Sequence, residues 1–205
     1  MNISLVFASL TSTRTETVLS EASTAADKMR VSADAVVKHP LQNEWSFWMF
    51  TNREKDNWEA NLVEMVSFDT VEDYWCLYHH MKTPSELDKG QDYLVFKKGI
   101  RPMWEDMGNK SGGRWLLMLD GVKPGYMDSI WSDVVLLLIG VNFEHSDEIN
   151  GVVVNIRDKN KISIWMRSIN RKAIVEVGRK LRVRFRLPCR IHFYKHNSST
   201  ALYSF

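Results

Sequence analysis

Two short apolar runs, residues 151–157 and 161–167, constrain the fold of this chain more than any other feature of its sequence. Both are rich in β-branched residues, and only a three-residue polar connection, 158–160, separates them. Runs of this length on either side of a short polar connection are typical of a β-hairpin. We therefore expect antiparallel strands here. The expected tip carries three basic side chains: Arg157, Lys159 and Lys161.

The other periodic segments predict further strands and three helices. An apolar run at 43–51 predicts a strand that is buried on both faces. Shorter runs predict strands at 93–96, 114–119 and 191–194. Helical spacing of apolar residues predicts helices at 71–80, 128–139 and 170–185. Strands outnumber helices and their order is mixed, so we expect an α+β fold. It would be a single domain with a curved, mostly antiparallel β-sheet backed by about three helices on its convex face.

Two of the helices have recognisable ends. Thr70 and Asp73 form a capping box before the first helix, Asp128 can cap the second, and Gly140 is a C-terminal stop signal. The first helix carries two apolar stripes: Val71, Trp75 and Tyr78 on one side, and Tyr74, Leu77 and Met81 on the other. One stripe can face an external partner, or both can face the core.

Length and composition favour one globular domain with a tail. The 205 residues have a mass of 23.9 kDa and are 44% hydrophobic, which is enough for a real core. Residues 1–37 are rich in Ser, Thr and Ala and predict a disordered N-terminal tail. The folded domain is expected over 38–205, beginning near His39-Pro40-Leu41.

Several classes of function lack support in the sequence. The net charge of +2 is too small for a general nucleic-acid binder, and the two cysteines form no Cys-x-x-Cys pair, which favours a reducing compartment. The first residues make a poor signal peptide, and no stretch is long enough to span a membrane. The usual catalytic signatures are missing, so we expect no enzyme and no cofactor. We expect no metal site either, because a polar loop explains His145, Asp147 and Glu148 better than metal binding does.

Eight tryptophans are many for this length, and most should pack in the core. Trp58 and Trp104 differ because both lie among polar residues. Trp104 is followed by Glu105, and Arg114 comes after a Gly-Gly pair that lets the backbone turn tightly. This stretch, residues 102–115, therefore offers a stacking face, a hydrogen-bond acceptor and a cation close together.

Five motifs in the same order resemble the family of eukaryotic translation initiation factor 4E, which binds the messenger RNA cap. The resemblance covers roughly residues 38 to 195 and places the chain in the class with tryptophan at both Trp45 and Trp58. The motifs are His39-Pro40-Leu41-Gln42-Asn43-x-Trp45, Phe68-Asp69-Thr70-Val71-Glu72-Asp73-Tyr74-Trp75, Arg101-Pro102-Met103-Trp104-Glu105-Asp106, Gly112-Gly113-Arg114-Trp115 and Val153-Val154-Asn155-Ile156-Arg157.

The resemblance implies a pocket for the 7-methylguanosine cap of messenger RNA. Trp58 and Trp104 would sandwich the base, whose positive charge adds cation–π attraction to stacking. Glu105 would accept from the base edge, which selects guanine over adenine, and Trp165 would lie near the methyl group. The triphosphate bridge would be held by Arg157 and Lys161, less directly by Arg114, with Lys159 as a further candidate.

The resemblance also implies a groove on the opposite face for protein partners. It would receive a Tyr-x-x-x-x-Leu-hydrophobic helix from initiation factor 4G or from 4E-binding repressor proteins. The groove residues by this resemblance are His39, Pro40, Val71, Trp75, Asp133 and Leu136.

The chain departs from the family pattern at two places. Ser132-Asp133 stands where the family usually has Leu-Glu, which removes an apolar contact and shortens an acid, so we expect weaker partner binding. The chain ends at Phe205, so the family's flexible segment beside the cap phosphates and its regulatory serine are not evident. Four nearby hydroxyls cannot safely stand in for that serine: Ser198, Ser199, Thr200 and Ser204.

The leading hypothesis is a non-enzymatic protein of the cytoplasm, with the nucleus as a second compartment, that brings capped messenger RNA to the initiation machinery. The first alternative is a cap-binding paralogue that mainly represses translation because of its altered partner groove. The others are an aromatic-cage reader of methylated lysine and an enzyme acting on the cap. The basic side chains along 179–190 could instead bind nucleic acid, although a solvated helix face explains them better.

Overall fold

The computed structural model describes residues 37–54, 57–185, 187 and 189–205. Within this part of the chain, residues 39–205 form one compact unit. The predicted disordered tail, residues 1–37, lies outside the described residues except for Val37, which is exposed.

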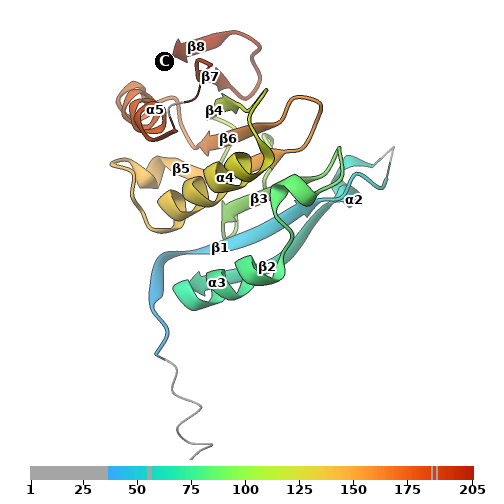
Figure 1. Cartoon of the computed structure of the whole chain (residues 1–205). Helices are drawn as coiled ribbons and strands as arrows, with labels where there is room; N and C mark the ends of the chain where they lie inside the picture. Colours follow the sequence, from blue (N-terminus) through green and yellow to red (C-terminus); the bar gives the residue numbers. More distant parts are fainter. Residues whose placement is uncertain (1–36, 55–56, 186, 188) are drawn as a thin grey trace, which may run out of the picture. The chain divides into compact units, whose positions relative to one another are not determined.

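A single sheet of eight strands forms the framework of this unit (Figure 1). Its spatial order is β2-β1-β3-β5-β6-β4-β7-β8, and every neighbouring pair is antiparallel. The strands are β1 (Pro40–Phe50), β2 (Leu62–Thr70), β3 (Asp92–Lys97), β4 (Gly113–Met118), β5 (Ile149–Asn155), β6 (Lys161–Met166), β7 (His192–Lys195) and β8 (Ala201–Ser204). The predicted hairpin is therefore confirmed as β5 and β6.

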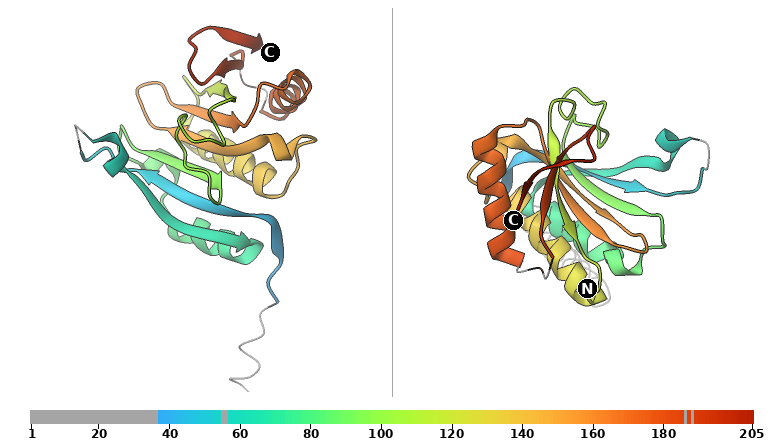
Figure 2. Two further views of the ribbon diagram at one scale, coloured as in Figure 1. Left: turned by 180° about the vertical axis from the view of Figure 1, so that it is seen from behind. Right: turned by 90° about the horizontal axis from the view of Figure 1, so that it is seen from above.

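Three helices cover the convex face of the curved sheet: α3 (Val71–His80), α4 (Pro124–Ile139) and α5 (Arg171–Phe185) (Figure 2). A fourth, α2 (Trp58–Asn61), is a single turn between β1 and β2, and two 3-10 turns, η1 (Pro84–Glu86) and η2 (Ser146–Glu148), complete the list. The α+β prediction, with a curved antiparallel sheet and helices on one face, is confirmed.

The capping prediction for α3 is confirmed in its main feature. The Asp73 backbone N–H donates to Thr70 Oγ1 at 3.2 Å, and the Thr70 hydroxyl donates to Asp73 Oδ2 at 2.6 Å. Asp73 therefore accepts from the side chain of the N-cap residue.

The predicted start of the second helix is wrong by one turn. Helix α4 begins at Pro124, because proline at the first position has a preset φ and no N–H that needs a partner. Asp128 lies inside the helix and caps nothing there. Its carboxylate instead accepts from the Ser85 backbone N–H at 2.9 Å and from the Ser85 hydroxyl at 2.6 Å.

The strands β2 and β8 were not predicted, and both lie at the edges of the sheet. An edge strand keeps one side open to solvent, so its residues do not alternate between polar and apolar as cleanly as in a half-buried strand. In β2 the apolar residues Val63, Met65 and Val66 are all exposed, and a register shift opposite Trp48 breaks the period of two.

The core beneath the helices is centred on Trp115 of β4, whose side chain is 0% exposed. Its indole N–H donates to the carbonyl of Ile174 in α5 at 3.1 Å. Its ring packs against Phe193 and Phe205, each with a centroid separation of 5.5 Å. This tryptophan ties β4 to α5 and to the last strands of the sheet.

A substitution at Gly178 in α5 tests directly how closely this helix packs on Trp115. A Cβ atom at this position would lie 2.2 Å from Cζ2 of Trp115. Glycine to alanine in a helix interior normally stabilises by up to about 1 kcal/mol. Overpacking a filled core costs about 1–3 kcal/mol, so we expect Gly178→Ala to lower the free energy of unfolding by about 1–2 kcal/mol in urea denaturation.

Gly125 in α4 is the matched control, because an added Cβ there meets nothing within 4 Å. Gly125→Ala should leave the free energy of unfolding unchanged or raise it slightly. A Gly178→Ala protein as stable as the wild type would contradict the described packing of α5 on Trp115.

Candidate functional site: an aromatic and charged cavity on the concave face

The alternation of side chains along β6 creates a cavity on the face of the sheet away from the helices. Lys161, Ser163 and Trp165 line the cavity, whereas Ile162 and Ile164 between them are 0% exposed and belong to the core. The cavity has a volume of about 570 Å³, within the usual range for ligand sites. Its lining is Trp58, Asp92, Leu94, Pro102, Trp104, Glu105, Arg114, Val153, Asn155, Arg157, Lys161, Ser163 and Trp165.

Two tryptophans with half-exposed rings stand at this cavity. Trp58 is 48% exposed and opens α2, where the Asn57 side chain accepts from the Ala60 backbone N–H at 3.1 Å. Its ring packs against Phe50 with centroids 5.7 Å apart. Trp104 is 51% exposed. A tryptophan left this open in a folded domain is available for stacking on a ligand.

Buried asparagines hold the loop that carries Trp104. The Asn109 amide donates to the carbonyls of Arg101 at 2.9 Å and Met103 at 3.0 Å. The Asn150 amide of β5 donates to the carbonyl of Gly108 at 2.7 Å and to Asn109 Oδ1 at 2.9 Å. These bonds fix the loop to the sheet, so Trp104 is presented on an ordered backbone.

Glu105 also lines the cavity, and its side chain is exposed. Among the described residues, no hydrogen bond or ion pair occupies its carboxylate. Both carboxylate oxygens are therefore free to accept from the edge of a ligand that lies beside Trp104.

Arg157 is held in place by a buried acid that the sequence analysis did not identify. Its guanidinium makes two bonds to Asp92, from Nη1 to Oδ1 at 2.7 Å and from Nη2 to Oδ2 at 3.1 Å. Asp92 is only 7% exposed, and burial raises the pKa of its carboxyl although Arg157 acts in the opposite direction. Asp92 therefore orients Arg157 and compensates part of its charge.

Two further cations lie in the same cavity, and burial lowers the pKa of both. The pKa of Lys161 is lowered first by burial and then by the neighbouring charges of Arg114 and Arg157, against a smaller opposite effect of Asp92. Burial also lowers the pKa of Arg114. Their mutual repulsion favours an anionic ligand between them.

Lys159 is not brought into this cavity. It lies exposed at the turn between β5 and β6 and is not among the lining residues. Its predicted phosphate contact stays a prediction.

Comparison with known proteins identifies the family. A sequence model described as "Eukaryotic initiation factor 4E" matches residues 40–204. The chain belongs to the eukaryotic initiation factor 4E family. It is 51% identical over 159 residues to translation initiation factor 4E1 of Drosophila melanogaster. The aligned region covers 77% of this chain and 61% of that protein. It is 45% identical over 176 residues to translation initiation factor 4E of Xenopus laevis, and the aligned region covers 83% of each of the two proteins.

Solved structures of the initiation factor 4E family share this fold. The Ascaris suum factor eIF4E-3 with m7G cap has a TM-score of 0.78 and 36% identity, and the match covers 82% of this chain and 98% of that one. The Caenorhabditis elegans factor eIF4E-3 with the 4E-binding protein Mextli and a cap analog has a TM-score of 0.77 and 35% identity, and the match covers 82% of this chain and 100% of that one.

The residues expected in the partner groove of an initiation factor 4E lie on the convex side, on and around α3. Val71 and Trp75 are exposed, whereas Tyr74 is buried and Leu77, Tyr78 and Met81 pack against the core. One face of α3 is therefore open and the other is core. Tyr78, grouped with Val71 and Trp75 on one stripe, packs against the core, and its ring lies 5.4 Å from that of Trp75.

His39 and Pro40 connect to the start of α3. The His39 carbonyl accepts from the Val71 backbone N–H at 2.9 Å. Both the backbone N–H and the ring of His39 bond to the Glu72 carboxylate, at 2.8 Å and 2.6 Å, and these bonds lower the pKa of Glu72. The first residues of the folded unit are thus joined to α3 where a partner helix is expected.

The unusual pair Ser132-Asp133 faces groups inside the protein. Asp133 accepts from Arg184 of α5 at 2.7 Å. Burial raises the pKa of the Tyr74 hydroxyl, and Ser132 acts on it in the opposite direction. Leu136, one turn further along α4, is half-buried. Asp133, expected as a partner contact, is therefore already occupied by an arginine.

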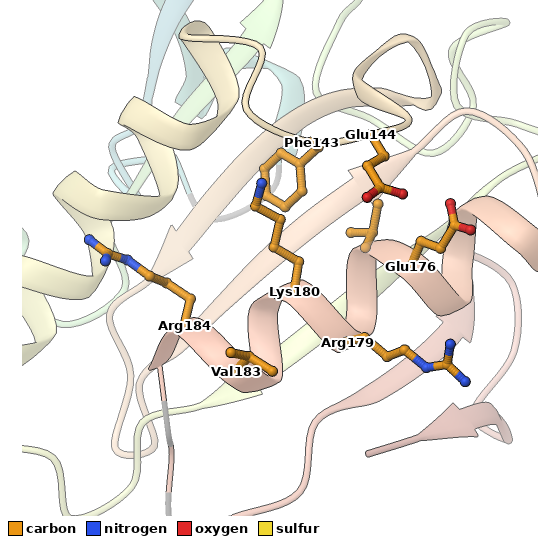
Figure 3. Close-up of a pocket in the computed structure, with 8 residues that line it drawn as sticks. Phe143, Glu144, Glu176, Arg179, Lys180, Val183 and Arg184 are labelled. Carbon is orange, nitrogen blue, oxygen red and sulfur yellow. The ribbon is translucent and has the colours of Figure 1, made fainter.

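A second cavity, of about 560 Å³, lies between α5 and the segment that follows α4 (Figure 3). Three of its charged side chains, Glu176, Lys180 and Arg184, have partners nearby. Lys180 bonds to Asn142 and lies over the ring of Phe143, 5.6 Å from its centroid. His145 pairs with Glu176 at 2.5 Å. The aromatic ring in its lining, Phe143, is buried, so this cavity lacks the exposed tryptophan rings of the first.

Other classes of site find no support in the described part of the chain. There, no three His, Cys, Asp or Glu side chains come close enough to hold a metal ion. Over the same residues, no helix has the length and apolar content needed to cross a membrane. On α5, three of the basic side chains bond within the protein: Lys180, Arg182 and Arg184. This favours a structural role for that helix face.

Proposed function

We propose that this protein binds the 7-methylguanosine cap of messenger RNA in the concave cavity and carries it to the translation initiation machinery through its convex face. One observation supports this most strongly. Two half-exposed tryptophans and a carboxylate without a protein partner line the same cavity as three cations. The action is binding and not catalysis.

The aromatic part of the cavity suits a methylated purine. Methylation at N7 gives guanine a delocalised positive charge, so stacking on Trp58 and Trp104 gains cation–π attraction. Each aromatic partner contributes about 1–3 kcal/mol of stacking. Glu105 accepts from the N1–H and the 2-amino group of guanine, while adenine offers no such pair of donors.

The cationic part of the cavity suits the triphosphate bridge. Asp92 holds Arg157 with its guanidinium at the cavity wall, and Lys161 and Arg114 add charge beside it. Phosphate oxygens between these groups relieve the repulsion among the cations. Binding of a triphosphate should therefore weaken as the salt concentration rises.

Lys161→Gln tests this division of roles. It removes one cation without touching the bidentate pair of Arg157 and Asp92. We expect about a tenfold loss of affinity for 7-methylguanosine triphosphate, with a salt dependence that is shallower by about one charge. Fluorescence titration at several salt concentrations measures both quantities.

Lys159→Gln is the control for that experiment, because Lys159 carries the same charge outside the cavity. It should change the affinity much less than Lys161→Gln does. A reader of methylated lysine would use the tryptophans but not the cations, so unchanged nucleotide affinity in Lys161→Gln would count against cap binding.

The convex face is proposed to receive a Tyr-x-x-x-x-Leu-hydrophobic helix of initiation factor 4G or of a 4E-binding repressor. The exposed side chains of Val71 and Trp75 offer the apolar surface that such a helix needs. Solved relatives bound to Mextli or to 4E-BP support this proposal.

Trp75→Ala should lower the affinity for a peptide with this motif by at least about tenfold, because exposed tryptophans at interfaces are frequent hot spots. Affinity for 7-methylguanosine triphosphate should stay within twofold, since Trp75 does not line the cavity. Isothermal titration with each ligand separates the two effects. Equal loss of both would point to a folding defect instead of a partner contact.

A cytoplasmic location, with the nucleus as a second compartment, stays a prediction from the sequence. Cys76 and Cys189 carry free thiols, which is compatible with it.

A further inference from the structure

His196, just after β7, packs against Trp165 in the wall of the cavity. Its ring centroid lies 4.2 Å from that of Trp165, with 41° between the planes. Phe96 contacts the same tryptophan edge-on at 5.5 Å and 77°. Trp165, a lining residue of the cavity, is therefore held between a phenylalanine from β3 and this histidine.

The two ring nitrogens of His196 are buried without a polar partner in the part of the chain that the structure describes. Neither Nδ1 nor Nε2 has a hydrogen bond among the described residues, and both atoms are inaccessible to solvent. Buried polar atoms without partners are uncommon, because leaving them unpaired costs free energy.

The surroundings keep this histidine uncharged. Burial, with a smaller effect of the Arg114 charge, lowers the pKa of His196 to about 4. At neutral pH the ring therefore packs on Trp165 as a neutral aromatic. The His196 backbone N–H points to the Gly112 carbonyl at 3.4 Å, which joins this segment to the start of β4.

We propose that His196 is a positioning residue for selectivity: it fixes Trp165 at the cavity wall and leaves the electron-rich indole available to a cationic, N7-methylated base. This inference rests on the proposed function. A charged group stacked on the back of the indole would draw on the same π system and repel the base cation. A neutral ring does neither, and it limits the freedom of the indole to rotate.

Three substitutions at this position separate the contributions of ring and charge. His196→Phe keeps an uncharged ring and should preserve the ratio of affinities for 7-methylguanosine triphosphate and GTP within about twofold. His196→Ala removes the ring and should lower that ratio about three- to tenfold, by loosening Trp165. His196→Lys replaces the ring with a cation and should lower the ratio at least as much as His196→Ala.

His192→Ala is the matched control. His192 lies on β7, bonds to the Ser204 hydroxyl at 2.7 Å and has its ring 6.2 Å from that of Tyr194. The His192→Ala substitution should leave the ratio of affinities for 7-methylguanosine triphosphate and GTP unchanged. A His196→Ala protein with the wild-type ratio would overturn the inference. Failure of the proposed function gives a different result: the wild-type protein itself then binds 7-methylguanosine triphosphate and GTP with equal affinity.

A double substitution tests whether His196 acts through Trp165. In a Trp165→Leu background, His196→Ala should leave the ratio unchanged, because the side chain that it positions is gone. A further fall in the ratio by the same factor as in the wild type would contradict the positioning role. A loss of stability alone lowers the affinities for both nucleotides by the same factor, so it does not change their ratio.

Discussion

Replacing Trp104 by alanine is expected to lower the affinity for 7-methylguanosine triphosphate by about 100-fold. The substitution removes one of two stacking faces together with its cation–π attraction, which amounts to about 2–3 kcal/mol. Because the Trp104 ring is half exposed, the free energy of unfolding should change by less than about 0.5 kcal/mol. Fluorescence titration and urea denaturation of the same preparation give both values.

Met107→Ala in the same loop is the control, because Met107 is 86% exposed and does not line the cavity. It should leave both affinity and stability unchanged. A Trp104→Ala protein that binds the methylated nucleotide within threefold of the wild type would show that the base is bound elsewhere.

Replacing Trp115 by alanine should mainly lower the stability of the fold, whereas Trp104→Ala mainly lowers the affinity for the nucleotide. We expect the free energy of unfolding to fall by about 3–5 kcal/mol, the usual cost of deleting a fully buried aromatic ring. The substitution opens a cavity among Phe193, Phe205 and α5 and leaves the Ile174 carbonyl without its donor. Urea denaturation measures the loss.

Trp115→Phe separates packing from hydrogen bonding. It keeps most of the ring contacts but removes the indole N–H, so it should cost about 1–3 kcal/mol. A loss below about 1 kcal/mol for Trp115→Ala would contradict the central place given to Trp115 in the core.

The contrast between these tryptophans shows what the sequence could predict. Trp104 lies among polar residues next to a carboxylate, and this local context indicated an exposed ring. Trp115 follows Arg114 directly, and strand alternation turns the arginine into the cavity and the tryptophan into the core. Local patterns of this kind also predicted the β5–β6 hairpin and the cap of α3.

Other features depend on contacts between distant segments, which a single sequence does not display. Asp92 precedes an apolar strand, and nothing nearby in sequence indicates that it pairs with Arg157, 65 residues away. His196 is an isolated histidine whose meaning comes only from Trp165 on another strand. Edge strand β2 lacks clear alternation because one of its sides is open to solvent.

The departures at Ser132 and Asp133 also acquire a different meaning in three dimensions. The sequence suggested a missing apolar contact and a shortened acid. In the structure, Asp133 accepts from Arg184, so this residue joins α4 to α5 on the convex side. A partner helix would therefore meet an Asp133 carboxylate that already has an arginine partner.

The most direct test of cap recognition compares the affinities of the wild-type protein for 7-methylguanosine triphosphate and GTP at one salt concentration. The two ligands differ by one methyl group and its charge. The arrangement of Trp58, Trp104 and Glu105 predicts binding that is about 10- to 100-fold weaker for GTP, because both stacking rings lose their cation–π attraction. Equal affinities for the two nucleotides would contradict the proposal.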